Sequence, residues 1–176
     1  MVKKLCILVF ALALFSCREQ QSDNANTSLP YFDIKGYFNS ESIRLQKQNP
    51  AVNKTVSVNG TGESQTVTIN DWQKELAIFA NADINKNSWK GSFTTDKIAD
   101  STVFTSDNRK IPVKKVTIVR DNSNVKKVEI IIDNKNILFQ SHDTLTYFPD
   151  SLYQIKKLQK IRLLKQKRYS ITGKLK

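Results

Sequence analysis

The residue types best suited to acid–base chemistry meet at one place in the sequence, where His142, the only histidine, precedes Asp143. Successive residues of a β-strand point to opposite faces of the sheet, so we expect this pair not to act as a dyad through adjacency. One histidine among carboxylates is also a poor set of zinc ligands. We therefore expect His142 to be an ordinary surface residue, and we expect no metal site.

Carboxylates offer the second possible chemistry. Asp71 and Glu75 lie four residues apart at the expected start of a helix, where anionic side chains are stabilising in any case. Asp96, Asp100 and Asp133 would serve glycoside hydrolysis only if two carboxyl groups converged at about 5 to 9.5 Å. The sequence contains no G-x-S-x-G, H-E-x-x-H or P-loop pattern. We expect no catalytic residue and no cofactor, and we predict that the protein is not an enzyme.

A cluster of basic residues near the C-terminus is the strongest departure from ordinary composition. The chain carries 28 Lys/Arg against 16 Asp/Glu, and nine of the basic residues but no acid lie from Leu152 onwards. Lysine on an exposed strand discourages edge pairing, which is the simplest explanation. The alternative is contact with anionic lipid or with an acidic protein partner. The residues expected at such a contact are Lys156, Lys157, Lys160, Arg162, Lys165, Lys167 and Arg168.

Two helices are predicted in the N-terminal half. Apolar residues at helical spacing predict a helix over residues 31–48, which Asn49-Pro50 ends. Asn70 and Gln73 form a capping-box arrangement, which predicts a second helix over residues 70–81.

Most of the remaining chain alternates between apolar and polar residues and is divided by turn-forming segments. Asn59-Gly60-Thr61-Gly62 between two β-branched runs predicts a β-hairpin. Later segments rich in Asn, Asp and Ser separate further strands. The predicted strands cover residues 52–58, 64–69, 89–95, 102–105, 111–120, 125–133, 137–141 and 144–148.

The C-terminal segment fits two structures. Apolar residues recur every third position over 152–161, as in a basic amphipathic helix, whereas residues from Tyr169 onwards alternate as in a strand. We favour a hairpin in which residues 153–164 pair with the end of the chain across a turn at residues 165–167. The predicted fold class is α+β: an antiparallel meander sheet, flat or curved, of seven to ten strands, with the two helices packed on one face.

The N-terminal end has the plan of a secretory signal. Lys3 and Lys4 precede an apolar run from Leu5 to Phe15, which as a helix would span about 16 Å, roughly half of a bilayer's hydrocarbon core. The run ends at Leu14-Phe15-Ser16-Cys17, which resembles the lipobox of bacterial lipoproteins. In these proteins a small residue precedes a cysteine that is lipidated and becomes the first residue. The resemblance implies that Cys17 is the lipid attachment site, with palmitate among the acyl chains that hold the protein to a membrane.

The domain organisation follows from this resemblance. We expect a signal peptide over residues 1–16, the lipidated cysteine and a flexible tether over 17–29, and one globular α+β domain over 30–176. The tether lacks aromatic residues, and as a random coil its twelve residues after the cysteine would span about 20 Å. Arg18 does not resemble the Asp that marks inner-membrane retention, so we expect the outer membrane and its periplasmic face.

These features favour a non-enzymatic binding or envelope-maintenance lipoprotein. A curved sheet with helices on one face would resemble lipoprotein-carrier folds, which hold acyl chains in an apolar concavity; a filled sheet–helix interface would count against that comparison. The alternatives are a carboxylate-dependent hydrolase acting on envelope glycans and an interaction module that uses the basic hairpin. Nucleic acid is not expected as a partner, because an exported lipoprotein does not share its compartment.

Overall fold

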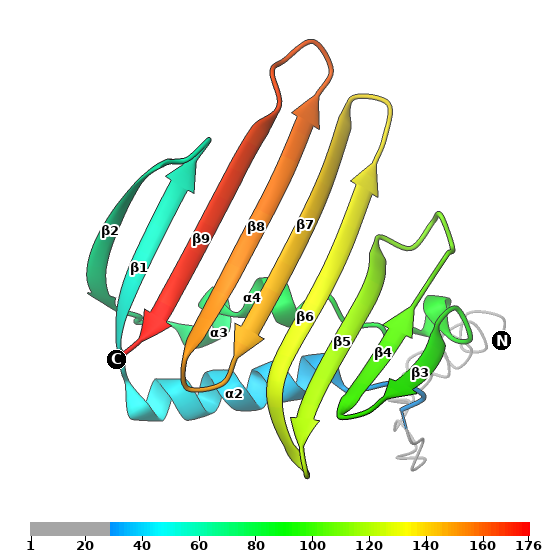
Figure 1. The fold of residues 1–176 in the computed structure, drawn as a ribbon, viewed down its shortest axis with the longest axis horizontal. Helices are drawn as coiled ribbons and strands as arrows, with labels where there is room; N and C mark the ends of the chain where they lie inside the picture. The colour runs from blue at the N-terminus through cyan, green and yellow to red at the C-terminus, as the bar shows by residue number, and fades with distance from the viewer. Residues whose placement is uncertain (1–28) are drawn as a thin grey trace, which may run out of the picture.

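The computed structural model describes residues 29–176 (Figure 1). The predicted signal peptide, Cys17 and nearly all of the tether lie outside the described residues. Within the described part, no helix is both long and apolar enough to cross a membrane.

One antiparallel sheet dominates this part of the chain, with the strand order β2-β1-β9-β8-β7-β6-β5-β4-β3 (Figure 1). Strands β3 to β9 follow one another as a meander, and the β1–β2 hairpin joins the sheet beyond β9. The strands are β1 (Ala51–Val58), β2 (Thr61–Thr68), β3 (Thr94–Ile98), β4 (Ser101–Thr105), β5 (Val113–Asp121), β6 (Asn124–Lys135), β7 (Phe139–Phe148), β8 (Leu152–Ile161) and β9 (Lys167–Leu175).

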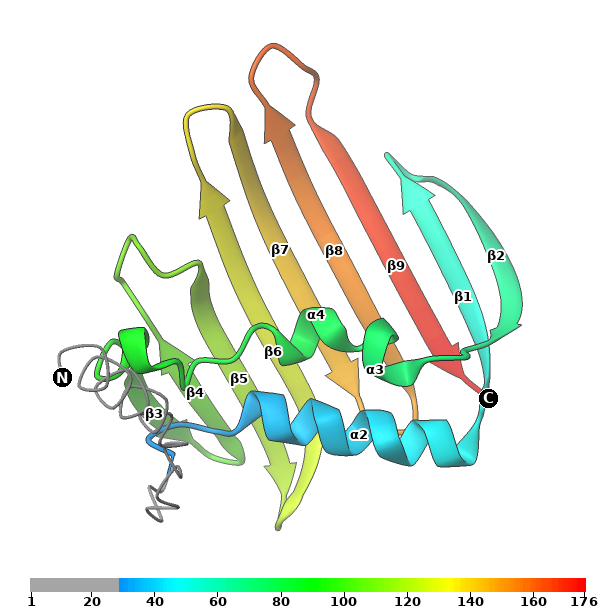
Figure 2. The same ribbon diagram turned by 180° about the vertical axis from the view of Figure 1, so that it is seen from behind.

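The helices are α2 (Ile34–Gln48), α3 (Trp72–Glu75) and α4 (Ala77–Ala80), with a 3-10 turn, η2, at Asn87–Trp89. The side chain of Asp33 accepts a hydrogen bond from the Gly36 amide and so caps the start of α2. Figure 2 shows these helices crossing one end of the long strands, on one face of the sheet. We call this the covered face and the opposite one the open face. The β6–β7 and β8–β9 hairpins extend beyond the helices.

The core lies between the helices and the covered face. Phe38 of α2 stacks on Phe79 with ring centroids 4.9 Å apart and meets the edge of Tyr147, 5.2 Å away. Trp72 packs against Tyr153 at 6.3 Å. All five of these aromatic residues are fully buried, so aromatic side chains fill the interface. This filling counts against the comparison with acyl-chain carriers.

The predicted antiparallel sheet accompanied by helices is confirmed, and so is the C-terminal hairpin of β8 and β9, although its turn spans residues 162–166 rather than 165–167. Three parts of the prediction are wrong in detail. Residues 89–95 form mostly the end of η2 and a loop, and the strand begins only at Thr94. The strands predicted at 137–141 and 144–148 form one continuous strand, β7. The predicted helix 70–81 is broken at Leu76, and Asp71 rather than Asn70 caps it by accepting from the Lys74 amide.

Candidate functional site

Alternation along β8 and β9 divides the predicted basic contact residues between the two faces. Lys156 pairs with Thr144 and Ser170 on the open face, whereas the next residue, Lys157, pairs with Asp143 and Tyr169 on the covered face. By the same alternation the open face carries Lys156, Lys160 and Arg168, the covered face carries Lys157 and Lys167, and the loop between the strands carries Arg162 and Lys165.

Lys157 differs from the others because it is already paired. Its Nζ lies 3.1 Å from Oδ2 of Asp143, whose side chain is buried. A buried carboxylate without a counter-ion is strongly destabilising, so Lys157 has a structural role. The other carboxylate oxygen of Asp143, Oδ1, has no hydrogen-bond partner among the described residues.

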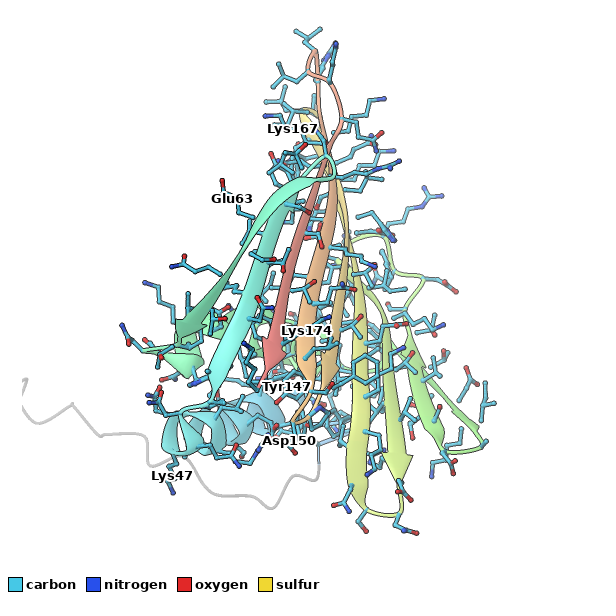
Figure 3. All side chains as sticks on the ribbon, turned by 60° about the vertical axis from the view of Figure 1, so that its left-hand side comes forward. Lys47, Glu63, Tyr147, Asp150, Lys167 and Lys174 are labelled. Atoms are coloured by element: carbon cyan, nitrogen blue, oxygen red, sulfur yellow. The ribbon has the colours of Figure 1, made fainter. Side chains whose placement is uncertain are left out.

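Two adjacent hairpin loops form the end of the sheet furthest from α2. We define the hairpin tip as residues 135–139 and 160–168. The loops are joined by a hydrogen bond of 2.8 Å from the Arg162 amide to the Leu138 carbonyl, and Phe139 pairs with Ile161. Figure 3 shows Lys167 at this end of the molecule, far from Tyr147 and Asp150 beside α2.

The hairpin tip combines exposed apolar side chains with uncompensated positive charge. The exposed fractions are 86% for Ile137, 64% for Leu138, 97% for Leu163 and 59% for Leu164. The tip contains no acidic residue, and no salt bridge joins its cations to an acid in residues 29–176. These cations are Lys135, Lys160, Arg162, Lys165, Lys167 and Arg168.

Leu163 also has an unusual backbone, with φ at +69°. A branched non-glycine residue in this region costs of order 1 kcal/mol or more, and such strain gathers at functional sites. The strained turn holds the most exposed leucine side chain at the end of the molecule. This apolar surface was not predicted from the sequence. The pairs Ile137-Leu138 and Leu163-Leu164, each within a polar and charged turn segment, could have indicated it.

His142 and Asp143 point to opposite faces, as the alternation predicts, but His142 has another acidic neighbour. Its Nδ1 lies 2.6 Å from Oδ1 of Asp133, the residue opposite it on β6. Both side chains are about half exposed, and the pair lies on the open face. Within residues 29–176, no three side chains of the types histidine, cysteine, aspartate and glutamate are grouped so that they could hold a metal ion.

Two carboxylates, Glu41 and Glu75, attach the helices to the sheet. Glu41 of α2 accepts a hydrogen bond of 2.5 Å from the Tyr147 hydroxyl and binds Arg44 at 2.8 Å. Arg44 also pairs with Asp150 after β7, and these carboxylates raise the pKa of its guanidinium, chiefly through the hydrogen bond with Glu41.

Glu75 of α3 forms the equivalent attachment further along the sheet. It accepts a hydrogen bond of 2.5 Å from the Tyr153 hydroxyl and binds Lys54 of β1 at 2.7 Å. Glu75 therefore has sheet partners that its position near a helix start did not predict.

Asp96, Asp100 and Asp133 do not gather into one cleft. Asp96 lies on β3 and Asp133 on β6, three strand spacings apart, which corresponds to about 14 Å. Asp100 lies in the turn between β3 and β4. The separation between Asp96 and Asp133 exceeds the range in which two carboxyl groups act together on a glycosidic bond.

Comparison of the chain with models of known protein families, with curated proteins and with solved structures finds no match in any of the three. The hairpin tip and the open face are the features on which a function can be proposed.

Proposed function

We propose that the protein is a non-enzymatic binding lipoprotein of the bacterial envelope, held by a lipid on Cys17, that contacts an anionic lipid surface with its hairpin tip. The observation that supports this proposal is the combination of exposed Ile137, Leu138, Leu163 and Leu164 with six neighbouring cations and no acid. Proteins that lie at a membrane interface join apolar insertion to electrostatic attraction in this way. The outer membrane, from its periplasmic side, is the proposed location.

The energies of the two contributions are comparable. Full burial of a Leu or Ile side chain contributes about 1.5 to 3 kcal/mol. A lysine or arginine near an anionic membrane contributes about 1 kcal/mol before screening. An acidic protein partner, the other predicted occupant, would use the cations but leaves the nearly complete exposure of Leu163 unexplained. For this reason we favour the lipid surface.

The proposed anchor and the hairpin tip can reach the same bilayer. Tyr31, near the start of the domain, contacts Phe104 on β4. The path from Phe104 to the tip has two components. One crosses three strand spacings to β7, about 14 Å, and the other runs along seven residues of that strand, about 23 Å. Twelve residues separate Cys17 from Pro30 and extend to at most about 40 Å. One lipidated residue and one tip would therefore provide two attachments to the same bilayer.

The anchor is tested by Cys17→Ala. We expect the variant to appear in the soluble envelope fraction after a high-salt wash, whereas the unchanged protein needs detergent for release. High salt is included because it screens the attraction between the tip and the membrane. Cell fractionation followed by immunoblotting measures the distribution, and a variant that still resists high salt would show that Cys17 is not the anchor.

The hairpin tip is tested on the mature chain without lipid, residues 18–176, exported behind an unrelated cleavable signal. We expect Leu163→Ser with Leu164→Ser to weaken binding to anionic phosphatidylglycerol vesicles by about tenfold or more, because two exposed apolar side chains are removed. Co-sedimentation measures the affinity, and circular dichroism checks the fold.

The matched control is Ile43→Ser with Ile98→Ser, which removes two other exposed isoleucines, on α2 and β3. This control is expected to bind as the unchanged chain does. Absence of binding to anionic vesicles, or equal loss in both double variants, contradicts the proposal. If the Leu163→Ser, Leu164→Ser variant instead loses an acidic protein partner while its vesicle binding is unchanged, the protein is an interaction module that uses the basic hairpin.

A further inference from the structure

A hollow of about 690 Å³ lies next to the hairpin tip and is lined largely by open-face side chains of β1, β7, β8 and β9. Strand pairing arranges these side chains in two rows. The first row places His142 beside Leu158 and Leu158 beside Arg168. The second row runs Thr144, Lys156, Ser170 and Ser57. The rows are two residues apart along the strands, which is about 7 Å.

Two cations face this hollow without a counter-ion. Lys156 and Arg168 lie diagonally across β8 and β9, so their Cα atoms are about 8 Å apart. Their long side chains can therefore reach one common anion. Neither forms a salt bridge with an acid among residues 29–176, and no acidic residue lines the hollow. Lys157 also borders the hollow, but it is paired with Asp143 on the covered face, and this carboxylate satisfies its charge.

The surrounding groups supply further donors. The hydroxyl-bearing residues Thr144 and Ser170 flank Lys156 on both sides. Arg168 is held in place through its backbone, since its amide donates to Oδ1 of Asn59 at 2.9 Å and its carbonyl accepts from the Asn59 amide at 2.8 Å. These bonds leave the Arg168 guanidinium unused and fix the strand that presents it.

We propose that this hollow binds a phosphate group carried by an organic molecule. Lys156 and Arg168 contact the phosphate, and Thr144 and Ser170 donate hydrogen bonds to its remaining oxygens. A phosphate matches this set better than a carboxylate, because it has more acceptor oxygens and carries up to two negative charges. The volume exceeds that of a phosphate alone, and Leu158 between the rows offers an apolar contact for the organic part.

The phosphate can belong to a lipid headgroup or to a soluble molecule. Arg168 and Gln166 belong both to the hollow and to the hairpin tip, so a headgroup of the bilayer that the tip contacts lies within reach. The lipid source rests on the proposed function, whereas binding of a soluble phosphate ester does not.

The test uses residues 18–176 and glycerol 3-phosphate as a soluble probe, followed by nuclear magnetic resonance of the backbone amides. We expect saturable shifts at Thr144, Lys156 and Ser170. The double variant Lys156→Gln with Arg168→Gln should bind about tenfold more weakly, or more weakly still, because charge-assisted hydrogen bonds are lost. The control, Lys115→Gln with Lys174→Gln, makes the same change of charge on the open face outside the hollow and is expected to bind normally.

Vesicles distinguish the two sources. Shifts with glycerol 3-phosphate support a site open to soluble ligands, and Lys156- and Arg168-dependent binding to phosphatidylglycerol vesicles alone supports a headgroup site. The Leu163→Ser, Leu164→Ser chain should retain the glycerol 3-phosphate shifts even if it no longer binds vesicles. The proposal for the tip and the proposal for the hollow can therefore fail independently of each other. Equal weakening in the control pair, or no response to either probe, overturns the phosphate site.

Discussion

Between pH 9 and pH 12 the domain is expected to lose about 5 kcal/mol of its free energy of unfolding through Tyr147 and Tyr153. Both side chains are fully buried, and burial is the main cause that raises the pKa of each phenol far above its ordinary value of 10.0. The second cause is the hydrogen bond that each hydroxyl donates to a carboxylate, Glu41 for Tyr147 and Glu75 for Tyr153. A carboxylate favours the protonated phenol and repels a tyrosinate.

The direction of the pH dependence follows from these raised pKa values. Below pH 10 both tyrosines are protonated in the folded and the unfolded chain, so their contribution to the free energy of unfolding is fully present. Above pH 10 the unfolded chain releases these protons while the folded chain keeps them, so unfolding becomes more favourable as the pH rises. At pH 12 the loss of stability from each tyrosine is roughly 2 to 3 kcal/mol, against a total stability of about 5 to 15 kcal/mol for ordinary domains.

Denaturant unfolding from pH 8 to 12, together with the ultraviolet absorbance of tyrosinate, measures this loss. We expect the absorbance of two buried tyrosines to rise only when the domain unfolds. The matched control is Tyr147→Phe with Tyr153→Phe, which keeps both rings but removes these two titrating groups and should make the decline much shallower. Tyr37, whose pKa is also raised by burial, accounts for the decline that remains. If both tyrosines ionise at an ordinary pH while the domain stays folded, the attachment of the helices through Glu41 and Glu75 is wrong.

The parts of the fold that sequence reasoning predicted are those governed by local chemistry. Asn59 and Gly60 have φ values of +53° and +91°, which a tight hairpin turn requires and which these two residue types tolerate. Asn49 ends α2 in the left-handed conformation, with φ at +48°. Such signals depend on neighbouring residues alone, and the antiparallel sheet follows from a series of them.

The helix predicted over residues 70–81 shows where local signals stop. A helix of this length is marginal by itself, so packing against the sheet decides its final shape. In the structure the chain leaves the helical conformation at Leu76 (φ −92°, ψ 3°), while Trp72, Leu76 and Phe79 are all buried. The apolar positions were therefore visible in the sequence, and the break between them was not.

The candidate sites were only partly predictable for a similar reason. The basic residues were identified from composition, but their division between two faces required the register of β8 and β9. The bond between Tyr147 and Glu41 joins residues 106 positions apart, and no local pattern marks it. Leu163 was assigned to a strand that in fact ends at Ile161, so its exposure followed only from the position of the loop.

Gly173→Val is expected to destabilise the domain by about 3 kcal/mol or more, the upper end of the range for overpacked sites. Gly173 is paired with Tyr153 across β8 and β9, and a Cβ at this position would clash with the hydroxyl-bearing edge of the Tyr153 ring. The glycine thus leaves room for the ring to cross β9 and for its hydroxyl to reach Glu75. Glu75 also binds Lys54, which is paired with Gly173 on the neighbouring strand β1. A side chain there displaces the ring and breaks the hydrogen bond that attaches α3 to the sheet.

Thermal and denaturant unfolding measure this cost, with Lys174→Val as the control, because that residue lies on the same strand but on the open face. The control is expected to change stability by less than about 0.5 kcal/mol. A double-mutant cycle of Gly173→Val with Tyr153→Ala assigns the cause, since removal of the ring should relieve most of the clash. Additive losses would show that the ring does not occupy the space above Gly173, and the glycine would then be needed for another reason than the passage of Tyr153 to Glu75.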